Sequence, residues 1–396
     1  EICTNFAKNV TIPDSVTNVY QMFNNCNNFN GAVHIGENVP NCWHLFYNCK
    51  FLNAPIYIGS NVTNTFEMFY NCENFAQDIN IPDSVTNAYH MFNNCLNFNG
   101  NVNIGSGITN TYQFFYNCVN LNSKISGMTS VENAYEMFYN DTNFNQVVDL
   151  PDSCTNIYQM FYNCHNLNSK FNIPSASKNM ANLFYGCNNF NQAVDIPEGS
   201  EDLSNMFLNC FNFNNTLQIP STAKNLYQMF KEANNFNQEV TIPSGVTNVY
   251  SLFYNCRNFN RSISLPQGVI DVSNLFFGCE NFDQTFTIPS SATNLVNLFR
   301  NCHNFNKAVT IPQGAEDLRG MFSRCNLFNQ LVTIPSGVTN CENMFSECYN
   351  FNKEVTIPAS VTNLSDMFNN CYNLNQSISL PYSNLSLSII SFKKIF

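Results

Sequence analysis

Cysteine has the widest chemical scope of the residues in this chain, because thiolates bind zinc, form disulfides and act as nucleophiles. The sequence holds 18 cysteines, and fifteen of them share one phase of a 23-residue spacing, which Asp141 and Ala233 interrupt. No Cys-x-x-Cys pair occurs, whereas a zinc site needs four converging ligands. Equivalent side chains of stacked repeats also project side by side. We therefore predict small buried apolar side chains with free thiols, and no metal site.

Acid–base chemistry has no recurring basis in the sequence. The five histidines, His34, His44, His90, His165 and His303, have no acidic or basic partner at a repeated offset. No phosphate-binding loop, nucleophile elbow or paired-carboxylate motif occurs. We therefore predict no catalytic residues, no cofactor and no enzymatic activity.

The charge balance excludes two classes of partner. The net charge is −11, whereas nucleic-acid binding needs a basic stripe. The chain has no run of about 18 apolar residues, which a membrane-spanning helix would require. We predict no nucleic-acid partner and no membrane insertion within this chain.

Aromatic residues form two columns that could bind a partner. The first begins at Tyr20 and recurs every 23 residues, and the second follows four residues later, with Tyr47 and Tyr70 among its members. Because tyrosine is enriched where proteins bind partners, we interpret the columns as a contact surface for a surface protein, a glycan or copies of the chain itself. A lateral aromatic ladder that only stabilises the fold stays open as the alternative. The hypothesis covers Tyr20, Trp43, Phe66, Tyr89, Tyr112, Tyr116, Tyr135, Tyr139, Tyr158 and Tyr162.

These columns arise from a tandem repeat. A Met-Phe pair, or a close variant of it, starts each repeat, and the spacing is 23 residues every time. A fixed period of this length is typical of a solenoid, in which each repeat buries its apolar face against its neighbours. We predict sixteen repeats in one solenoid over residues 22–381, a partial first repeat over residues 1–21 with a processed or truncated N-terminus, and a C-terminal cap over residues 382–396. The repeats start at Met22, Leu45, Met68, Met91, Phe114, Met137, Met160, Leu183, Met206, Met229, Leu252, Leu275, Leu298, Met321, Met344 and Met367.

Each repeat combines two hydrophobic periods. The alternation of Val33 and Ile35 around one polar residue predicts a strand, and proline or glycine ends it. Met91, Phe92 and Cys95 continue a spacing of i, i+3, i+4 and i+7 that predicts two turns of helix. The predicted fold is a leucine-rich-repeat-like solenoid of about 17 rungs, with one parallel β-sheet and short helical turns on the other side.

Asparagine occupies one phase at the bend between the two sides of the repeat. Asn18 and Asn41 begin this column, and Asp202, Asp271 and Asp317 replace asparagine in it. Aspartate keeps the acceptor oxygen of the amide and loses its donors. The acceptor contact, to a backbone N–H where the next segment begins, is therefore predicted to be the shared one.

The repeats resemble a known family. The M-F…F-N-Q pattern, as in Met229-Phe230 and Phe236-Asn237-Gln238, is similar to the mycoplasma-type branch of the BspA-like leucine-rich repeats. The I-P-x-S-V-T pattern, as in Ile81-Pro82-Asp83-Ser84-Val85-Thr86, resembles the treponemal branch.

The resemblance covers essentially the whole chain. It implies display outside the cell or on the cell surface, and adhesion to host proteins, glycans or other cells, without catalytic residues. The expected function is a non-catalytic adhesion or binding protein. The alternative is a structural subunit of a fibre, filament or virion appendage that associates with itself through its side faces.

Overall fold

The computed structural model describes residues 6–380. The chain divides into two units, Glu1–Ser200 (unit 1) and Glu201–Phe396 (unit 2), and both are built from the same rung. The 23-residue period of the sequence runs through the division without a change in length. The predicted cap over residues 382–396 lies outside the described residues, and the prediction of one solenoid stays a prediction.

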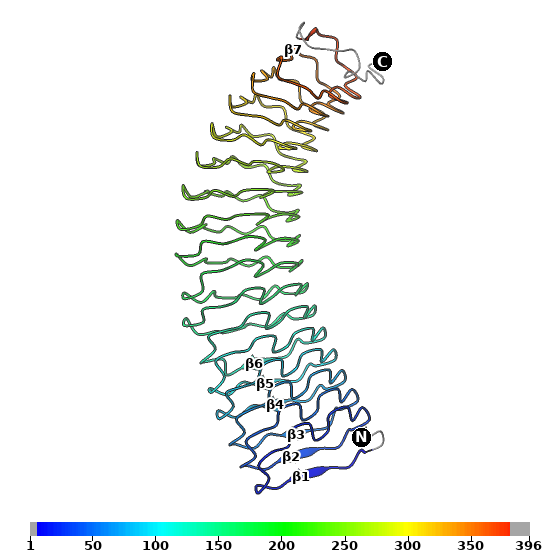
Figure 1. Ribbon diagram of the computed structural model, residues 1–396, viewed down its shortest axis with the longest axis vertical. Helices are drawn as coiled ribbons and strands as arrows, with labels where there is room; N and C mark the ends of the chain where they lie inside the picture. The colour runs from blue at the N-terminus through cyan, green and yellow to red at the C-terminus, as the bar shows by residue number, and fades with distance from the viewer. Residues whose placement is uncertain (1–5, 381–396) are drawn as a thin grey trace. The chain divides into compact units, whose positions relative to one another are not determined.

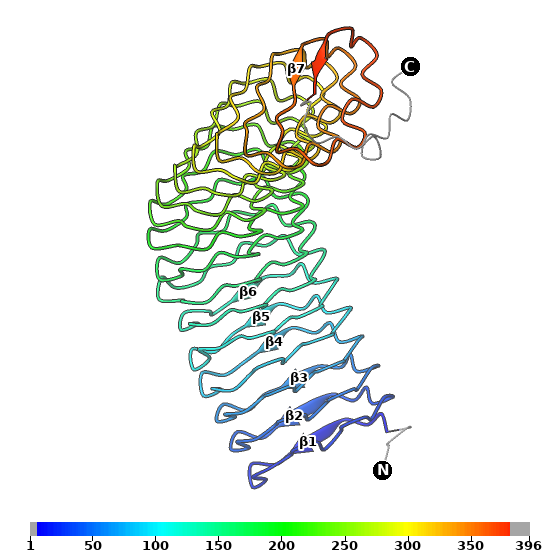
Figure 2. The ribbon, with the colours of Figure 1, turned by 45° about the horizontal axis from the view of Figure 1, so that its top comes forward.

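Within each unit, consecutive repeats stack as parallel rungs. The strands of unit 1 are β1 (Val10–Ile12), β2 (Val33–Ile35), β3 (Ile56–Tyr57), β4 (Ile79–Asn80), β5 (Val102–Asn103) and β6 (Ile125–Ser126), and those of unit 2 are β7 (Val355–Thr356) and β8 (Ile378–Ser379). All pairs are parallel, and each residue pairs with its equivalent one repeat later, as Val33 does with Ile56. Figures 1 and 2 show β1 to β6 in successive rungs, on the same side of unit 1. The predicted repeat solenoid with parallel strands is confirmed.

The strands form short sheets where one long sheet was predicted. The described sheets are β1-β2-β3, β4-β5-β6 and β7-β8, and single bridges such as Val148↔Phe171 occur between other rungs. Equivalent core rings lie one rung apart, so their separation reflects the rung spacing. This separation is 5.3 Å for Phe69–Phe92, beside the strands, and 5.9 Å for Phe161–Phe184, beyond them. The β7-β8 ladder nevertheless forms where Phe345–Phe368 lie 5.7 Å apart, so ring separation alone does not decide where a ladder ends.

The other side of each rung is a chain of β-turns, and no helix occurs among the described residues. In the first rung, Met22 N–H donates to the Val19 carbonyl and Cys26 N–H to the Phe23 carbonyl. The third residue of both turns has a positive φ, 56° at Gln21 and 60° at Asn25, as a type II turn requires. Gln21 N–H and Asn25 N–H donate to the next rung instead. The prediction of short helical turns is therefore wrong. Two successive β-turns place the same apolar residues inward as two turns of helix would.

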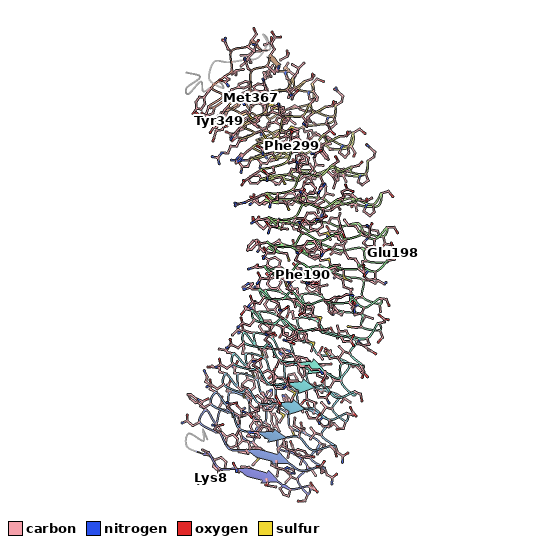
Figure 3. All side chains as sticks on the ribbon, turned by 180° about the vertical axis from the view of Figure 1, so that it is seen from behind. Lys8, Phe190, Glu198, Phe299, Tyr349 and Met367 are labelled. Atoms are coloured by element: carbon pink, nitrogen blue, oxygen red, sulfur yellow. The ribbon has the colours of Figure 1, made fainter. Side chains whose placement is uncertain are left out.

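Phenylalanine fills the space between the two sides. The ring of the Met-Phe pair and a second ring six residues later stack within a rung, at 4.4 Å for Phe23 and Phe29. The first ring stacks on its equivalent in the next rung, as Phe23 does on Phe46. The second ring does so where the next rung also has phenylalanine, as Phe305 does on Phe328, so the core is continuous within a unit. Figure 3 shows Phe190 inside unit 1 with Glu198 at its margin, and Phe299 inside unit 2. Loss of one such ring to alanine would cost about 3–5 kcal/mol.

Candidate functional site

The bend before each turn segment fixes the first aromatic column. The Oδ1 atom of Asn18 accepts a hydrogen bond from the backbone N–H of Tyr20 at 2.9 Å, and Asn133 does the same for Tyr135 at 3.1 Å. Asp202 keeps this contact with Ser204 at 3.0 Å. The predicted acceptor contact is thus confirmed, although it opens a turn and not a helix. It sets the backbone from which each aromatic side chain leaves.

The first aromatic column is half-buried along unit 1. Tyr20 is 43% exposed at the first rung, and the rings that follow are partly covered. Tyr112 and Tyr135 stack at 5.1 Å with 5° between their planes, and Tyr158 continues the stack 5.4 Å from Tyr135. Trp43 packs between its neighbours at 4.9 and 5.6 Å. The ladder predicted as the structural alternative is therefore present from Tyr112 to Tyr158. The half-buried members are Trp43, Phe66, Tyr89, Tyr112, Tyr135 and Tyr158.

The second aromatic column lies beside the first and is stacked more tightly. Tyr116, Tyr139 and Tyr162 follow one another at 4.8 and 4.5 Å, and Tyr185, which the sequence hypothesis did not include, extends the stack at 4.2 Å. Interplanar angles are at most 7°. Ring faces are thus turned toward one another. A partner would meet mainly ring edges and hydroxyl groups. The two columns of residues 20–185 are called the aromatic face below.

Polar side chains separate the two columns, and the sequence hypothesis missed them. They belong to the positive-φ residue that follows each member of the first column, such as His44, Glu67 and Glu136. His44 Nε2 lies 2.6 Å from Glu67 Oε2, and Gln113 donates to the Glu136 carboxylate. A polar residue directly after each aromatic residue of the first column was the available signal.

The buried Glu136 carboxylate shapes the electrostatics of the aromatic face. The pKa of Tyr135 is raised mainly by partial burial, and further by a hydrogen bond to Glu136 and by the negative charge of Glu136. Burial is also the main cause that raises the pKa of Tyr112 and Tyr116, and the negative charge of Glu136 adds to it. Burial lowers the pKa of His90, against the effect of Glu67 and Glu136. The phenols therefore stay protonated hydrogen-bond donors at physiological pH.

The cysteine column is internal and unreactive. The described cysteines are free, and nearly all are buried. The Sγ atom of Cys49 donates to the Phe23 carbonyl of the preceding rung at 3.0 Å, and the pattern repeats down to Cys371 and Phe345. Burial raises the pKa of Cys371 in this column to about 12, and it does the same for Cys42 and Cys341, which lie outside the column. The predicted free thiols are confirmed for the described cysteines, and the hydrogen bond to the neighbouring rung is an additional role.

Asp141 replaces cysteine in this column and is fully buried. Its Oδ1 atom accepts a hydrogen bond from the Cys118 backbone N–H at 2.6 Å, while Oδ2 has no partner. Burial raises the pKa of Asp141 well above its usual range, and the Cys118 contact only partly offsets this. The carboxyl group is enclosed by the core, so no substrate can reach it.

Other chemistry finds no geometric support in residues 6–380. No group of three or more histidine, cysteine or acidic side chains that could hold a metal lies within this range. His34 stacks on Tyr57 at 4.4 Å, and His44 and His90 belong to the aromatic face. Residues 6–380 contain no helix that is long and apolar enough to cross a membrane.

Solved structures show where this architecture is found. A leucine-rich repeat protein from Bacteroides ovatus ATCC 8483 is similar over 94% of this chain and 91% of its own, with 17% identity and a TM-score of 0.54. A leucine-rich repeat protein from Eubacterium ventriosum ATCC 27560 covers 83% of this chain and 79% of its own, with 19% identity and a TM-score of 0.38. A leucine-rich cell surface protein from Faecalibacterium prausnitzii A2-165 covers 98% and 82%, with 18% identity and a TM-score of 0.30. The Bacteroides structure supports the leucine-rich-repeat fold.

Family comparison agrees with the repeat. No curated protein matches the chain. The family described as "Mycoplasma protein of unknown function, DUF285" matches residues 3–105, 105–197, 178–288, 266–357 and 293–389. These segments together span nearly the whole sequence, which confirms the predicted resemblance to mycoplasma-type repeats. The chain therefore belongs to the DUF285 family.

Proposed function

We propose that this protein is a non-catalytic binding module displayed outside the cell, and that the aromatic face of unit 1 contacts a protein partner. The observation behind the proposal is the exposed edge of the aromatic face, where stacked rings hold phenol groups in fixed positions. Such rigid tyrosines lose little conformational entropy on binding and are enriched in interfaces. The resemblance to BspA-like surface proteins supports the extracellular location.

The stacking geometry favours a protein over a glycan at this face. Sugars pack against open ring faces, but those of Tyr116, Tyr139 and Tyr162 are covered by the neighbouring rings. Ring edges and phenol hydroxyls remain for a partner, and protein interfaces use these groups. Folding alone does not need the columns, since Ser273, Arg319 and Glu342 take the corresponding places in later repeats.

Adhesion of beads coated with the full chain to a monolayer of cultured epithelial cells would test the proposal. Tyr112→Ser with Tyr135→Ser removes one stacked pair from the aromatic face. Tyr227→Ser with Tyr250→Ser removes a matched pair from unit 2, where the rings lie 5.4 Å apart. Each double variant should lose about 0.5–1.5 kcal/mol of stability from the lost aromatic contact, or somewhat more with area burial.

Only the first double variant should lose adhesion, and protease treatment of the monolayer should abolish binding of the parent protein. Equal adhesion of both variants would reduce the aromatic face to a stabilising ladder. Sedimentation velocity of the parent separates the alternative, because a self-associating structural subunit would form polymers that the Tyr112/Tyr135 variant disrupts.

A further inference from the structure

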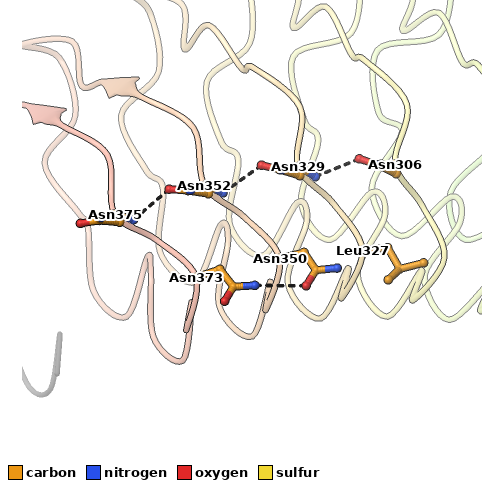
Figure 4. A pocket seen from close by; sticks show the side chains of 7 residues that line it. All are labelled: Asn306, Leu327, Asn329, Asn350, Asn352, Asn373 and Asn375. Atoms are coloured by element: carbon orange, nitrogen blue, oxygen red, sulfur yellow. Dashed lines mark hydrogen bonds between the residues drawn. The ribbon is translucent and has the colours of Figure 1, made fainter.

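Two asparagine columns border an open groove in unit 2. One wall is lined by Asn306, Asn329, Asn352 and Asn375, and the other by Leu327, Asn350 and Asn373 (Figure 4). The groove has a volume of about 570 Å³ and runs across four successive rungs. Its two walls are two residues apart in each repeat, and the residue between them is a buried core ring, such as Phe328 or Phe351.

The first wall presents oriented donors. The Oδ1 atom of Asn306 accepts a hydrogen bond from the backbone N–H of Asn329, and Asn329 and Asn352 repeat the contact with the following rung, each at 2.9 Å. This contact fixes the plane of each carboxamide. The Nδ2 groups of Asn329 and Asn352 donate no hydrogen bond within the described residues, so each rung offers an unused N–H pair to the groove.

The second wall is an amide ladder with one interruption. Asn373 Nδ2 donates to Asn350 Oδ1 at 3.3 Å, as Asn304 does to Asn281 earlier in the column at 3.2 Å. Leu327 stands where the connecting asparagine would be and is 46% exposed. Asn350 Nδ2 therefore has no acceptor within the described residues, and an apolar platform lies between polar amides.

We propose that this groove binds an extended, uncharged β-1,4-linked polysaccharide that runs along the rungs. Equivalent core rings beside the groove repeat at 5.9 Å for Phe305–Phe328 and 6.1 Å for Phe328–Phe351, and the sugars of such a chain follow one another at a comparable rise. One amide donor per rung then meets hydroxyl, ring or acetamide oxygens once per sugar, and Leu327 packs against an apolar sugar face. Neutral amides and a net charge of −11 disfavour an anionic chain. The proposal does not rest on the aromatic face, which other columns build in unit 1.

Calorimetric titration of the full chain tests this site, with chitohexaose and cellohexaose as ligands. Maltohexaose is the control ligand, because its α-1,4 linkages curve the chain away from a straight repeat. At least one β-1,4-linked hexasaccharide should bind, and maltohexaose should not. Absence of binding by both, or equal binding of maltohexaose, would overturn the proposal.

Matched substitutions separate the donors from the fold. Asn329→Asp keeps the acceptor oxygen and removes the donor, and Asp283 already accepts the Asn306 backbone N–H in this column at 3.0 Å. The affinity should fall at least tenfold while the melting temperature stays close to that of the parent. Asn248→Asp is the control, because it makes the same exchange at the bend, where Asp271 is accommodated at 2.8 Å from the Ser273 N–H. Loss of affinity in both variants, or in neither, would contradict the assignment.

Leu327→Asn makes stability and binding diverge. An asparagine there can donate to Asn304 and accept from Asn350, which completes the ladder. The melting temperature should rise, while the hexasaccharide affinity should fall several-fold because the platform and the free Asn350 donor are lost. An unchanged affinity in a more stable variant would exclude Leu327 and Asn350 from the site.

Discussion

The role of each asparagine side chain depends on which backbone or side-chain group its amide faces. At the bend, Asn64 Oδ1 accepts the Phe66 N–H within the rung at 3.0 Å. In the turns, Asn48 and Asn71 join neighbouring rungs through Nδ2–Oδ1 bonds of 2.8 Å. The sequence predicted the bend contact because aspartate replaces asparagine there. It did not predict the ladders, because the direction of those amides depends on the distance to the next rung.

The protonation of Asp141 should make the stability of the fold depend on pH. Its pKa is raised in the folded state, so the unfolded chain releases the proton more readily and stability falls as pH rises above about 4. The slope is roughly 1.4 kcal/mol per pH unit until the folded pKa is reached. Asp141→Cys should remove this dependence, since a thiol there can donate to the preceding rung as Cys118 donates to Phe92.

Thermal melts of the parent and Asp141→Cys at pH 4, 6 and 8 would check this. The variant should be more stable at every pH, with the margin widest at pH 8. A margin that shrinks as pH rises would show that the Asp141 carboxylate is stabilised when charged.

The thiol column should resist alkylation until the protein unfolds. Burial raises the pKa of the thiols, and their Sγ–H groups are bound to carbonyl oxygens inside the core. Iodoacetamide at pH 8 should leave the described cysteines of the native protein largely unmodified. The same reagent in denaturant without reductant should label them, as measured by mass spectrometry. Disulfide-linked peptides between neighbouring rungs would contradict the structure.

The β-turns of each rung have the same apolar spacing as the helix that the sequence predicted. Residues equivalent to Val19, Met22, Phe23 and Cys26 point inward in a helix and in successive β-turns alike. The distinguishing signal was polar: Gln21 and Asn25, which have positive φ, lie four residues apart, and asparagine is a poor helix former that tolerates this conformation. The strands β1 to β8 lie where the apolar alternation predicts them, but the place where a ladder ends depends on how adjacent rungs pack. No local sequence pattern encodes it.

The bend can be tested with one pair of substitutions. Asn133→Asp keeps the acceptor for the Tyr135 N–H and should leave stability nearly unchanged. Asn133→Leu leaves that N–H without its partner and should cost about 1 kcal/mol, as loss of a comparable cap does. Denaturant titration measures both. Equal losses in the two variants would show that the amide donors, and not the shared acceptor, hold the bend.

The prediction of one solenoid rests on the constant period, because a repeat that keeps its length brings each residue of a rung against its equivalent in the next. The candidate site was predicted only in part. The two aromatic columns and their ladder alternative were visible in the sequence, since both follow the period. Glu136 and the groove of unit 2 were not, because each depends on side chains that adjacent rungs bring together. The groove also depends on Leu327, which interrupts a column of asparagines and is informative only when the neighbouring rungs are compared.

Deletion of one repeat tests the central claim, that each rung is held by the same contacts to its neighbours. Removal of residues 91–113 should bring equivalent positions back into register, because the bonds of Phe69 to Met91 and of Phe92 to Phe114 recur one rung apart. Circular dichroism and a thermal melt should show a cooperative fold with a melting temperature near that of the parent. Removal of residues 91–102 alone should abolish the cooperative melt, because every later inward residue of unit 1 loses its equivalent. Equal unfolding by both deletions would contradict the account.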